Sequence, residues 1–370
     1  MKKYRRIFAA LLAAILLAGS VFAAGEDLQS ILKNTAAAVQ KQQADSNDLP
    51  AGNSVSDWNM LALARAGLAE NAKEYLKELR SYVEAAYRES GGLDRIKATE
   101  WHRTALTVLA LGDDPTAFGK KPDGTDIDLI ADGTYNWCCE TELGTQGMNA
   151  WIFALITLDA GGYEIPADAR YQRGDILRQI LDCQLEDGGF NLTKGGSADA
   201  DLTAMALQAL APYKESCGTQ IEKALNCLSA LQQTDGGFSS WGCKNSESIA
   251  QAIIALTALG IDPERDARFI KNGTSIVSAL LAYRTADGMF SHDETMENDL
   301  MATEQAMLAL EAQARLRDGR NSLYDMRDAA CPPERNGANL ILIAAAAAAL
   351  LAGTAAWIII RRKRRVKNHE

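Results

Sequence analysis

Residues 183–190 read Cys-Gln-Leu-Glu-Asp-Gly-Gly-Phe, and residues 231–238 repeat the pattern as Leu-Gln-Gln-Thr-Asp-Gly-Gly-Phe. A weaker copy, Tyr-Arg-Thr-Ala-Asp-Gly-Met-Phe, occupies residues 283–290. Asp-Gly-Gly predicts a tight turn, because glycine adopts a positive φ without steric cost, and the aromatic residue is placed to pack that turn onto a core. A spacing of about 50 residues between copies indicates stacked supersecondary units.

An apolar helix rich in Ala, Leu and Met is predicted after each turn, and six such segments can be overlaid by their ends. These ends lie at residues 64–67, 109–112, 156–159, 208–211, 257–260 and 308–311. Before each comes an amphipathic stretch at helical spacing, short and Asp-rich (126–131) before the third. Buried inner helices ringed by amphipathic outer helices predict an all-α fold, an (α/α)6 toroid of six helix hairpins. A linear solenoid is the alternative, and six copies favour a closed ring.

Both ends of the chain are predicted to lie outside this domain, which spans residues 25–320. Residues 1–24 combine a basic start, a short apolar run and small residues, as in a cleavable signal peptide, with an uncleaved anchor as the alternative. After a linker at 321–337, residues 338–360 are uncharged and long enough for a transmembrane helix. The basic tail at 361–370 predicts, by the positive-inside rule, a single-pass cell-membrane protein whose domain is extracytoplasmic.

Charge and cysteine content narrow the function classes. The chain carries a formal net charge of −10, and removing both predicted end segments leaves about −19, which disfavours nucleic acid as a partner. Seven cysteines are an odd number for an exported protein, so at least one is expected to be unpaired or to pair between molecules. No Cys-x-x-Cys pair occurs and the chain has only three histidines, so we predict no metal site.

The repeated turn resembles a known family. Gln184-x3-Gly188-x-Phe190 and its copy at residues 232–238 are similar to the Gln-x3-Gly-x-aromatic repeat of squalene and hopene cyclases, which recurs in protein prenyltransferase β subunits. Residues 199–206, Asp-Ala-Asp-Leu-Thr-Ala-Met-Ala, resemble two motifs: the Asp-x-Asp-Asp-Thr-Ala acid motif of class II terpene cyclases and a helix of the cobalamin carriers intrinsic factor and transcobalamin. The likeness covers roughly residues 28–317 and implies the fold more strongly than an activity, because this fold hosts unrelated functions.

The sequence also departs from each relative. Asp201 aligns with the cyclase acid, but Leu202 replaces the carboxylate that follows it, and aromatic residues make up only 6% of the chain. The prenyltransferase zinc site implies an Asp, a Cys and a His in the later repeats, where His292 is the only histidine. The thioester stretch of complement-type domains is missing at residues 241–244. The resemblance therefore leaves none of the three chemistries intact.

The first turns of the inner helices are expected to converge on one mouth of the barrel, where the overlay places two columns of residues. The first is Asp57, His102, Asn149, Asp201, Ala250 and Met301, and the second includes Glu100, Asp199, Ser248 and Asp299. Polar groups above an apolar interior are typical of a small-molecule pocket, which nearby tryptophans would wall. The predicted ligand-binding set is Asp57, Trp58, His102, Asn149, Trp151, Asp199, Asp201, Ser248 and Asp299.

Each of these residues also has a structural alternative. Asp, Ser and Asn at helix starts are usually N-caps, and His102 on an inner helix is more often a core residue than a catalytic one. Four aspartates between residues 123 and 132 are interpreted mainly as a turn and a helix start, since the twelve-residue calcium loop pattern is incomplete.

The leading hypothesis is a non-catalytic binding module at the cell surface that holds a small ligand, with a corrinoid as one candidate, or an extracellular protein. We expect no cofactor. The first alternative is a terpene cyclase- or prenyltransferase-like enzyme with Asp201 as the acid, supported by Asp199. The second is a carbohydrate-active toroid, which needs two facing carboxylates about 5–9.5 Å apart. Candidates for that pair are Asp57, Asp199, Asp201 and Asp299. A purely structural role at the surface is the remaining alternative.

Overall fold

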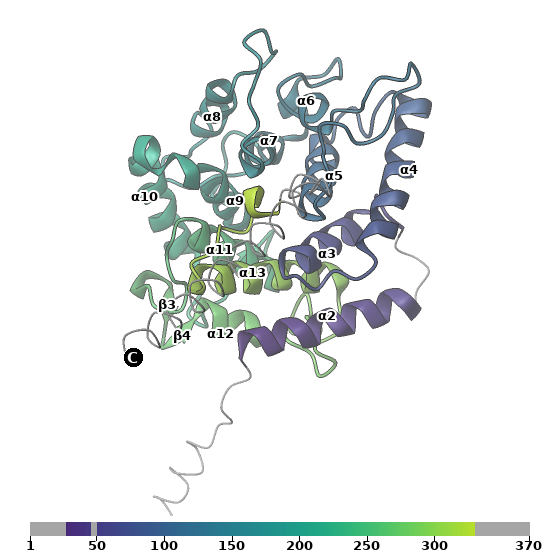
Figure 1. Ribbon diagram of the computed structural model, residues 1–370. Helices are drawn as coiled ribbons and strands as arrows, with labels where there is room; N and C mark the ends of the chain where they lie inside the picture. Colours follow the sequence, from purple (N-terminus) through teal and green to yellow (C-terminus); the bar gives the residue numbers. More distant parts are fainter. Residues whose placement is uncertain (1–26, 46–49, 330–370) are drawn as a thin grey trace, which may run out of the picture. The chain divides into compact units, whose positions relative to one another are not determined.

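The computed structural model describes residues 27–45 and 50–329, and within them six helices form a closed inner ring (Figure 1). These are α3 (Ser54–Arg65), α5 (Ala98–Ala110), α7 (Met148–Ala160), α9 (Ala200–Leu210), α11 (Ser246–Ala258) and α13 (Leu300–Arg317). Each packs against the next, and α13 packs against α3. The predicted α/α toroid is therefore confirmed, and the contact between the last and first inner helices excludes a linear solenoid.

Alanine lets the inner helices approach closely. Ala150, Ala154, Ala204 and Ala252 are fully buried, and helices pack 8–10 Å apart where such small side chains meet. α7 and α11 are apolar around most of their circumference, as expected for helices with neighbours on every side. The inner ring is consequently the core of the domain.

The outer helices within the described ranges cover this ring. They are α2 (Leu28–Asp45), α4 (Ala72–Ser90), α6 (Leu129–Gly133), α8 (Arg173–Leu181), α10 (Lys214–Leu231) and α12 (Ile276–Leu281). α6, α8, α10 and α12 each pack against the preceding inner helix, and α2 packs against α13. On α4 the buried residues are Leu79, Val83 and Tyr87, one helical turn apart, so a single face is apolar. The third outer helix is short, as predicted.

The Asp-Gly turns join outer helices to inner ones. Gly188 and Gly236 both have φ of +88°, and Phe190 and Phe238 behind them are fully buried. After the second turn comes a hairpin of β1 (Ser239–Ser240) and β2 (Cys243–Lys244), and β3 (Ile270–Lys271) pairs with β4 (Thr274–Ser275) before α12. Short 3-10 helices complete the described chain: η1 (Leu143–Gln146), η2 (Ala211–Tyr213), η3 (Ala267–Phe269) and η4 (Met326–Asp328).

The folded domain extends past residue 320. Residues 321–329, predicted as the start of a linker, pack onto the inner ring, with Leu323 and Met326 buried. Asp328 forms ion pairs with both Arg65 (2.7 Å) and Arg315. In Figure 1 this last described part of the chain, drawn in yellow, lies inside the ring.

The predicted signal peptide, most of the linker, the transmembrane helix at 338–360 and the basic tail lie outside the described residues. Within residues 27–45 and 50–329, no helix combines the length and apolar character that crossing a membrane requires. The six cysteines in these ranges all carry free thiols, and two of them, Cys217 and Cys227, are buried.

Candidate active site

A chamber of about 180 Å³ lies in the middle of the inner ring. It is lined by residues from the first half of each inner helix and by one residue of the C-terminal segment: Ser54, Trp58, Thr99, Glu100, Arg103, Asn149, Phe153, Met205, Gln251, Glu304, Gln305, Leu308 and Tyr324. Convergence of side chains from every inner helix on one space makes this chamber the candidate site.

The lining residues show which positions face the ring axis. On α3, α5 and α7 the chamber is lined by pairs four residues apart, such as Asn149 and Phe153, which lie on one helix face. Four residues before the lining residues Met205, Gln251 and Gln305, on the same helix faces, are Asp201, Glu247 and Met301. We therefore assign these three residues to the rim of the chamber. The positions that the sequence overlay placed at the mouth are therefore correct on α7, α9 and α13. On α3, α5 and α11 the overlay chose positions three residues too far along the chain.

Asp57, which was predicted to line the pocket, is not among the residues that line the chamber. Its carboxylate is fully buried and accepts hydrogen bonds from the Gly52 amide (3.0 Å), the Tyr75 hydroxyl (2.6 Å) and Arg103 Nε (3.0 Å). Arg103 also pairs with Glu100 at 2.7 Å and lines the chamber. Asp57 therefore orients Arg103 and does not itself face a ligand, so the prediction that it lines the pocket is wrong.

His102 is likewise a core residue. It is fully buried, and its Nε2 atom lies 2.8 Å from the carbonyl oxygen of Gly133, the last residue of α6. Burial lowers the pKa of His102 to about 4, so the imidazole is neutral near pH 7. The histidine holds an outer helix to the inner ring, and it does not line the chamber.

Of the two tryptophans in the predicted ligand-binding set, only one lines the chamber. Trp58 lines the chamber and packs against Phe153, with ring centroids 5.8 Å apart. Trp151 instead packs edge to face on Tyr171, which precedes α8, at 5.4 Å. Trp151 therefore supports the outer layer and takes no part in the chamber wall.

Two aspartates act as N-caps, the structural alternative raised for them. Asp199 Oδ1 accepts from the Leu202 amide (3.0 Å), and Asp299 Oδ1 accepts from the Ala302 amide (2.8 Å). Asp199 Oδ2 also accepts from the Ser240 hydroxyl at 2.6 Å. Asp199 and Asp299 are thus used as helix caps, and Asp57 is bound by Arg103. Three of the four candidates for a facing carboxylate pair therefore have structural partners, and the carbohydrate hypothesis gains no support.

Asp201 differs from these aspartates because it is largely buried and little bonded. Its Oδ1 atom has no hydrogen-bond partner among the described residues. Burial, with a smaller contribution from the charge of Asp199, raises the pKa of Asp201 to about 6, although Ser248 and Ser240 nearby act in the opposite direction. The Ser248 hydroxyl is fully buried and is the main group that opposes the effect of burial on this carboxyl. Asp201 is therefore an acid that holds its proton far more readily than an ordinary aspartate.

Glu304 is a chamber residue that the sequence reasoning missed. It is 3% exposed, and its Oε2 atom has no hydrogen-bond partner in the described part of the chain. Burial raises the pKa of Glu304 well above its ordinary value, despite the positive charge of Arg103 nearby. The signal was present in the sequence, because Glu304 is an acid in the apolar middle of a predicted inner helix.

Glu247, the residue of α11 assigned to the rim, has a histidine partner. Glu247 accepts from, or shares a proton with, His292 across 2.8 Å between Oε1 and Nδ1. This contact raises the pKa of His292, which is half-exposed. The acids of the 123–132 run have partners too: Asp128 caps α6, and Asp132 accepts from the Tyr87 hydroxyl at 2.6 Å.

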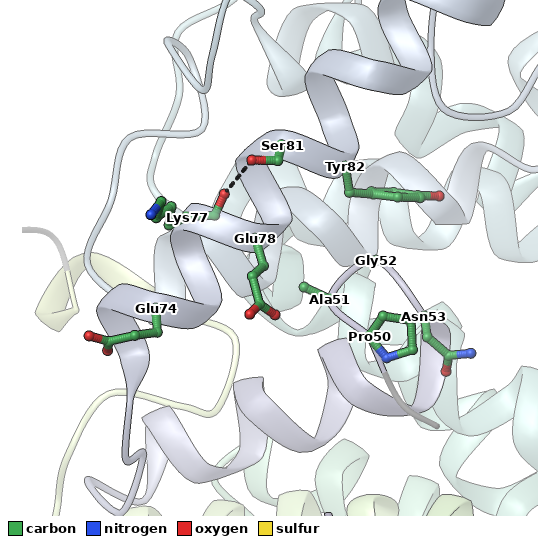
Figure 2. A pocket seen from close by; sticks show the side chains of 9 residues that line it. All are labelled: Pro50, Ala51, Gly52, Asn53, Glu74, Lys77, Glu78, Ser81 and Tyr82. Atoms are coloured by element: carbon green, nitrogen blue, oxygen red, sulfur yellow. Dashed lines mark hydrogen bonds between the residues drawn. The ribbon is translucent and has the colours of Figure 1, made fainter. Parts of the chain in front are cut away.

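A larger hollow than the chamber lies elsewhere. It measures about 740 Å³ and is formed by α4 and the segment from Pro50 to Asn53, as Figure 2 shows. Glu74, Lys77, Glu78 and Ser81 project along its α4 side, and Tyr82 lies flat over Gly52. It is open to solvent and touches no inner helix beyond the N-cap of α3, so it lacks the convergence found in the chamber.

Comparison with known proteins places this geometry in context. The sequence profile of the prenyltransferase alpha-alpha toroid domain matches residues 141–270 and 240–322. A drimenyl diphosphate synthase from Streptomyces showdoensis is 23% identical over 265 residues, covering 70% of this chain and 49% of that protein. The chain thus spans about half the length of this curated relative.

One solved structure is similar in fold, and a second gives a weaker match. Candida albicans protein geranylgeranyltransferase-I, complexed with GGPP, superposes with a TM-score of 0.53 at 12% identity, covering 78% of this chain and 92% of that one. An ent-copalyl diphosphate synthase from Streptomyces platensis gives a TM-score of 0.43 at 20% identity, covering 70% and 50%. The curated relative is an enzyme, which contradicts the hypothesis of a non-catalytic binding module and the expectation that the protein is not an enzyme.

Proposed function

Because this chain carries a prenyltransferase alpha-alpha toroid domain, we propose that it is a terpene-cyclase-like enzyme in which Asp201 protonates a carbon–carbon double bond of a polyprenyl chain. Similarity to drimenyl diphosphate synthase supports the reaction class. The observation that carries the proposal is Asp201 itself, a largely buried carboxyl with a raised pKa and an unpartnered oxygen, one helical turn before the chamber residue Met205.

The reaction would begin with proton transfer from Asp201 to one alkene carbon. The π electrons form the new C–H bond, the other carbon becomes a cation, and Asp201 is left as a carboxylate. A second double bond of the same chain then attacks the cation and forms a ring bond. Loss of a proton from a carbon beside the final cation restores a double bond, so the sequence is an isomerisation in which atoms and charge balance.

Leu202, where the cyclase motif has a second carboxylate, is compatible with this role. Burial is the largest cause of the raised pKa of Asp201, and the neighbouring charge that adds to it comes from Asp199. Leu202 is 7% exposed, and its amide is bound by Asp199. An apolar neighbour therefore leaves the acid desolvated, which favours the protonated form.

Most residues lining the chamber are polar, but its aromatic members suit an apolar chain and a cation. Trp58, Phe153 and Tyr324 present aromatic rings, whose faces attract positive charge. Arg103 is the one basic residue among the lining residues, and Asp57 and Glu100 neutralise it. We therefore expect the hydrocarbon part of the substrate, and not a phosphate group, to occupy the chamber.

Asp201→Asn is the direct test. The amide cannot donate a proton of comparable acidity, so turnover of polyprenyl substrates, followed by gas chromatography of the products, should fall at least about a thousandfold. Circular dichroism should be unchanged, since Asn is nearly isosteric. Asp128→Asn, which keeps a cap on α6 far from the chamber, is the matched control and should retain activity. Full turnover by a folded Asp201→Asn protein would refute the assignment.

We also propose that residues 338–360 hold the enzyme in the cell membrane with the toroid on the extracytoplasmic side. The support is the uncharged stretch followed by a basic block. The full chain should remain in the membrane fraction after carbonate washing, and a variant with Leu342→Asp and Leu350→Asp should be released. Release of the unaltered chain would count against the anchor. The predictions of a corrinoid ligand and of a protein partner remain untested.

A further inference from the structure

A second cavity of about 450 Å³ lies at the other end of the inner ring. The C-terminal halves of α7, α9 and α11 form part of its wall, with Ile156, Gln208 and Ile254 among the lining residues. Most of the remaining wall comes from the C-terminal segment, through residues 322–325 and Arg327. This lower cavity contains none of the acids assigned to the reaction.

Tyr324 lines both the lower cavity and the chamber above it. On the chamber side its ring lies edge to face with Trp58, with centroids 6.5 Å apart. A chain of glutamines joins three neighbouring inner helices: Gln208 Nε2 donates to Gln251 Oε1 (2.8 Å), and Gln251 Nε2 donates to Gln305 Oε1 (3.0 Å). Gln208 lines the lower cavity, whereas Gln251 and Gln305 line the chamber. Tyr324 is therefore the residue shared by the two spaces and forms the partition between them, and the hydrogen-bonded glutamines connect their walls.

The position of Tyr324 is fixed by its own segment. Leu323 is 2% exposed and Met326 is fully buried, and Arg65 binds the carbonyl oxygens of Ser322 and Asp325 at 3.3 and 3.2 Å. Because Tyr324 lies outside every inner helix, replacing its ring leaves the helix contacts of the toroid intact. The partition can thus be altered without rebuilding the fold.

The volumes of the chamber and of the lower cavity indicate how Tyr324 affects ligand binding. Pockets for small organic ligands usually measure about 300–1,000 Å³, so the chamber is below this range, whereas the lower cavity is within it. We propose that Tyr324 is a specificity-determining residue that limits the length of the apolar chain accepted by the chamber, and that the lower cavity is the space a longer chain would occupy. The chemical class of that chain, polyprenyl, rests on the proposed function.

The experiment compares binding along two homologous series in the full-length protein. Geraniol, farnesol and geranylgeraniol form the prenyl series, and octanol, dodecanol and hexadecanol form a series that cannot be cyclised. Dissociation constants are measured by titration calorimetry. Tyr324→Ala should improve the affinity for geranylgeraniol and hexadecanol by at least about tenfold and leave geraniol and octanol within about twofold, because only long chains need the second space.

Two variants serve as controls. Tyr324→Phe keeps the ring, and Ser322→Ala trims a neighbour that lines only the lower cavity and contacts Arg65 through its backbone carbonyl, so both should retain the length limit of the unaltered protein. If circular dichroism shows that Tyr324→Ala is unfolded, Tyr324→Leu tests the same opening with less lost packing. An unchanged length limit in a folded Tyr324 variant, for both series, would overturn the proposal.

Failure of this inference can be told apart from failure of the proposed function. A shift in the length limit for the alkanols, without turnover of any prenyl substrate, would keep Tyr324 as the partition and refute the cyclase. Turnover of prenyl substrates with a length limit that Tyr324→Ala does not move would refute the partition and keep the cyclase.

Discussion

At the scale of single residues, three carboxyl groups of the inner helices have different hydrogen-bonding surroundings. Asp57 accepts hydrogen bonds from three donors, including Arg103. Asp201 and Glu304 each retain an oxygen without a partner among the described residues. For Asp201, a place in the first helical turn favours the ionised form by about 0.3–1 kcal/mol. Burial outweighs that effect, since the pKa is still raised to about 6.

The pKa of Asp201 predicts how catalysis depends on pH. The acid must be protonated to act, so kcat/KM should be constant below about pH 6 and fall about tenfold per pH unit above it. A pH profile of the initial rate checks this. A profile that keeps rising above pH 7 would show that a different group initiates the reaction.

The same shift predicts a pH dependence of stability. Between the ordinary pKa of 3.8 and the raised value of about 6, the folded state holds more protons than the unfolded state, so stability falls as pH rises through this window. The loss for this group is at most about 3 kcal/mol. Urea unfolding at about pH 4.5 and pH 7 should show a smaller difference in Asp201→Asn than in the unaltered protein. Equal differences would mean that the carboxyl is solvated.

At the scale of elements, the repeated glutamine links each turn to the next outer layer. Gln184 Nε2 donates to the carbonyl oxygens of Gly188 and Gln220, both at 2.8 Å. Gln232 Nε2 donates in the same way to Gly236 (2.9 Å) and Phe269 (3.1 Å). One side-chain amide therefore satisfies two backbone carbonyls from neighbouring repeats, which explains why this residue type recurs at this position of the turn.

Neighbouring glutamines offer a matched test of this link. Gln232→Ala leaves two largely buried carbonyl groups without their donor, so it should lower the free energy of unfolding by about 2 kcal/mol. Gln233→Ala removes only a contact with the Ser239 hydroxyl and should cost less than about 1 kcal/mol. Urea denaturation of both variants gives the comparison. Equal losses would mean that the glutamine of the motif has no special structural role.

At the scale of the whole domain, contacts between distant parts of the sequence close the ring. The Thr35 hydroxyl on α2 donates to the carbonyl oxygen of Gly288 in the third turn, at 2.7 Å. Asp328 joins Arg65 of α3 to Arg315 of α13, and both arginine side chains are only 3% exposed. The first and last inner helices are thus fastened together by the segment that carries Tyr324.

Asp328→Asn should therefore destabilise the closure. Two buried guanidinium groups lose a charged partner, although Arg315 keeps Glu311. Because the Asp328 side chain is about a third exposed, we expect a loss of only about 1–2 kcal/mol, read from urea unfolding. Hydrogen exchange in residues 321–329 should also become faster. Asp325→Asn breaks a pair with the exposed Arg327 and should leave both measurements nearly unchanged.

The sequence by itself determined the repeat, the helices and the ring, because the glycine turn and the apolar periodicity act locally, the turn in three copies and the apolar helical segment in six. It also identified Asp201 as the candidate acid. Tertiary structure decided which residues of each inner helix face the ring axis. An overlay of the helices that is wrong by one turn still aligns apolar residues with apolar residues, so the sequence cannot reveal the error. For this reason the overlay chose Asp57 and His102 where Ser54 and Thr99 line the chamber. Tertiary structure also decided the pKa of Asp201 and the place of Tyr324, because burial and the return of the C-terminal segment into the ring depend on neighbours distant in sequence.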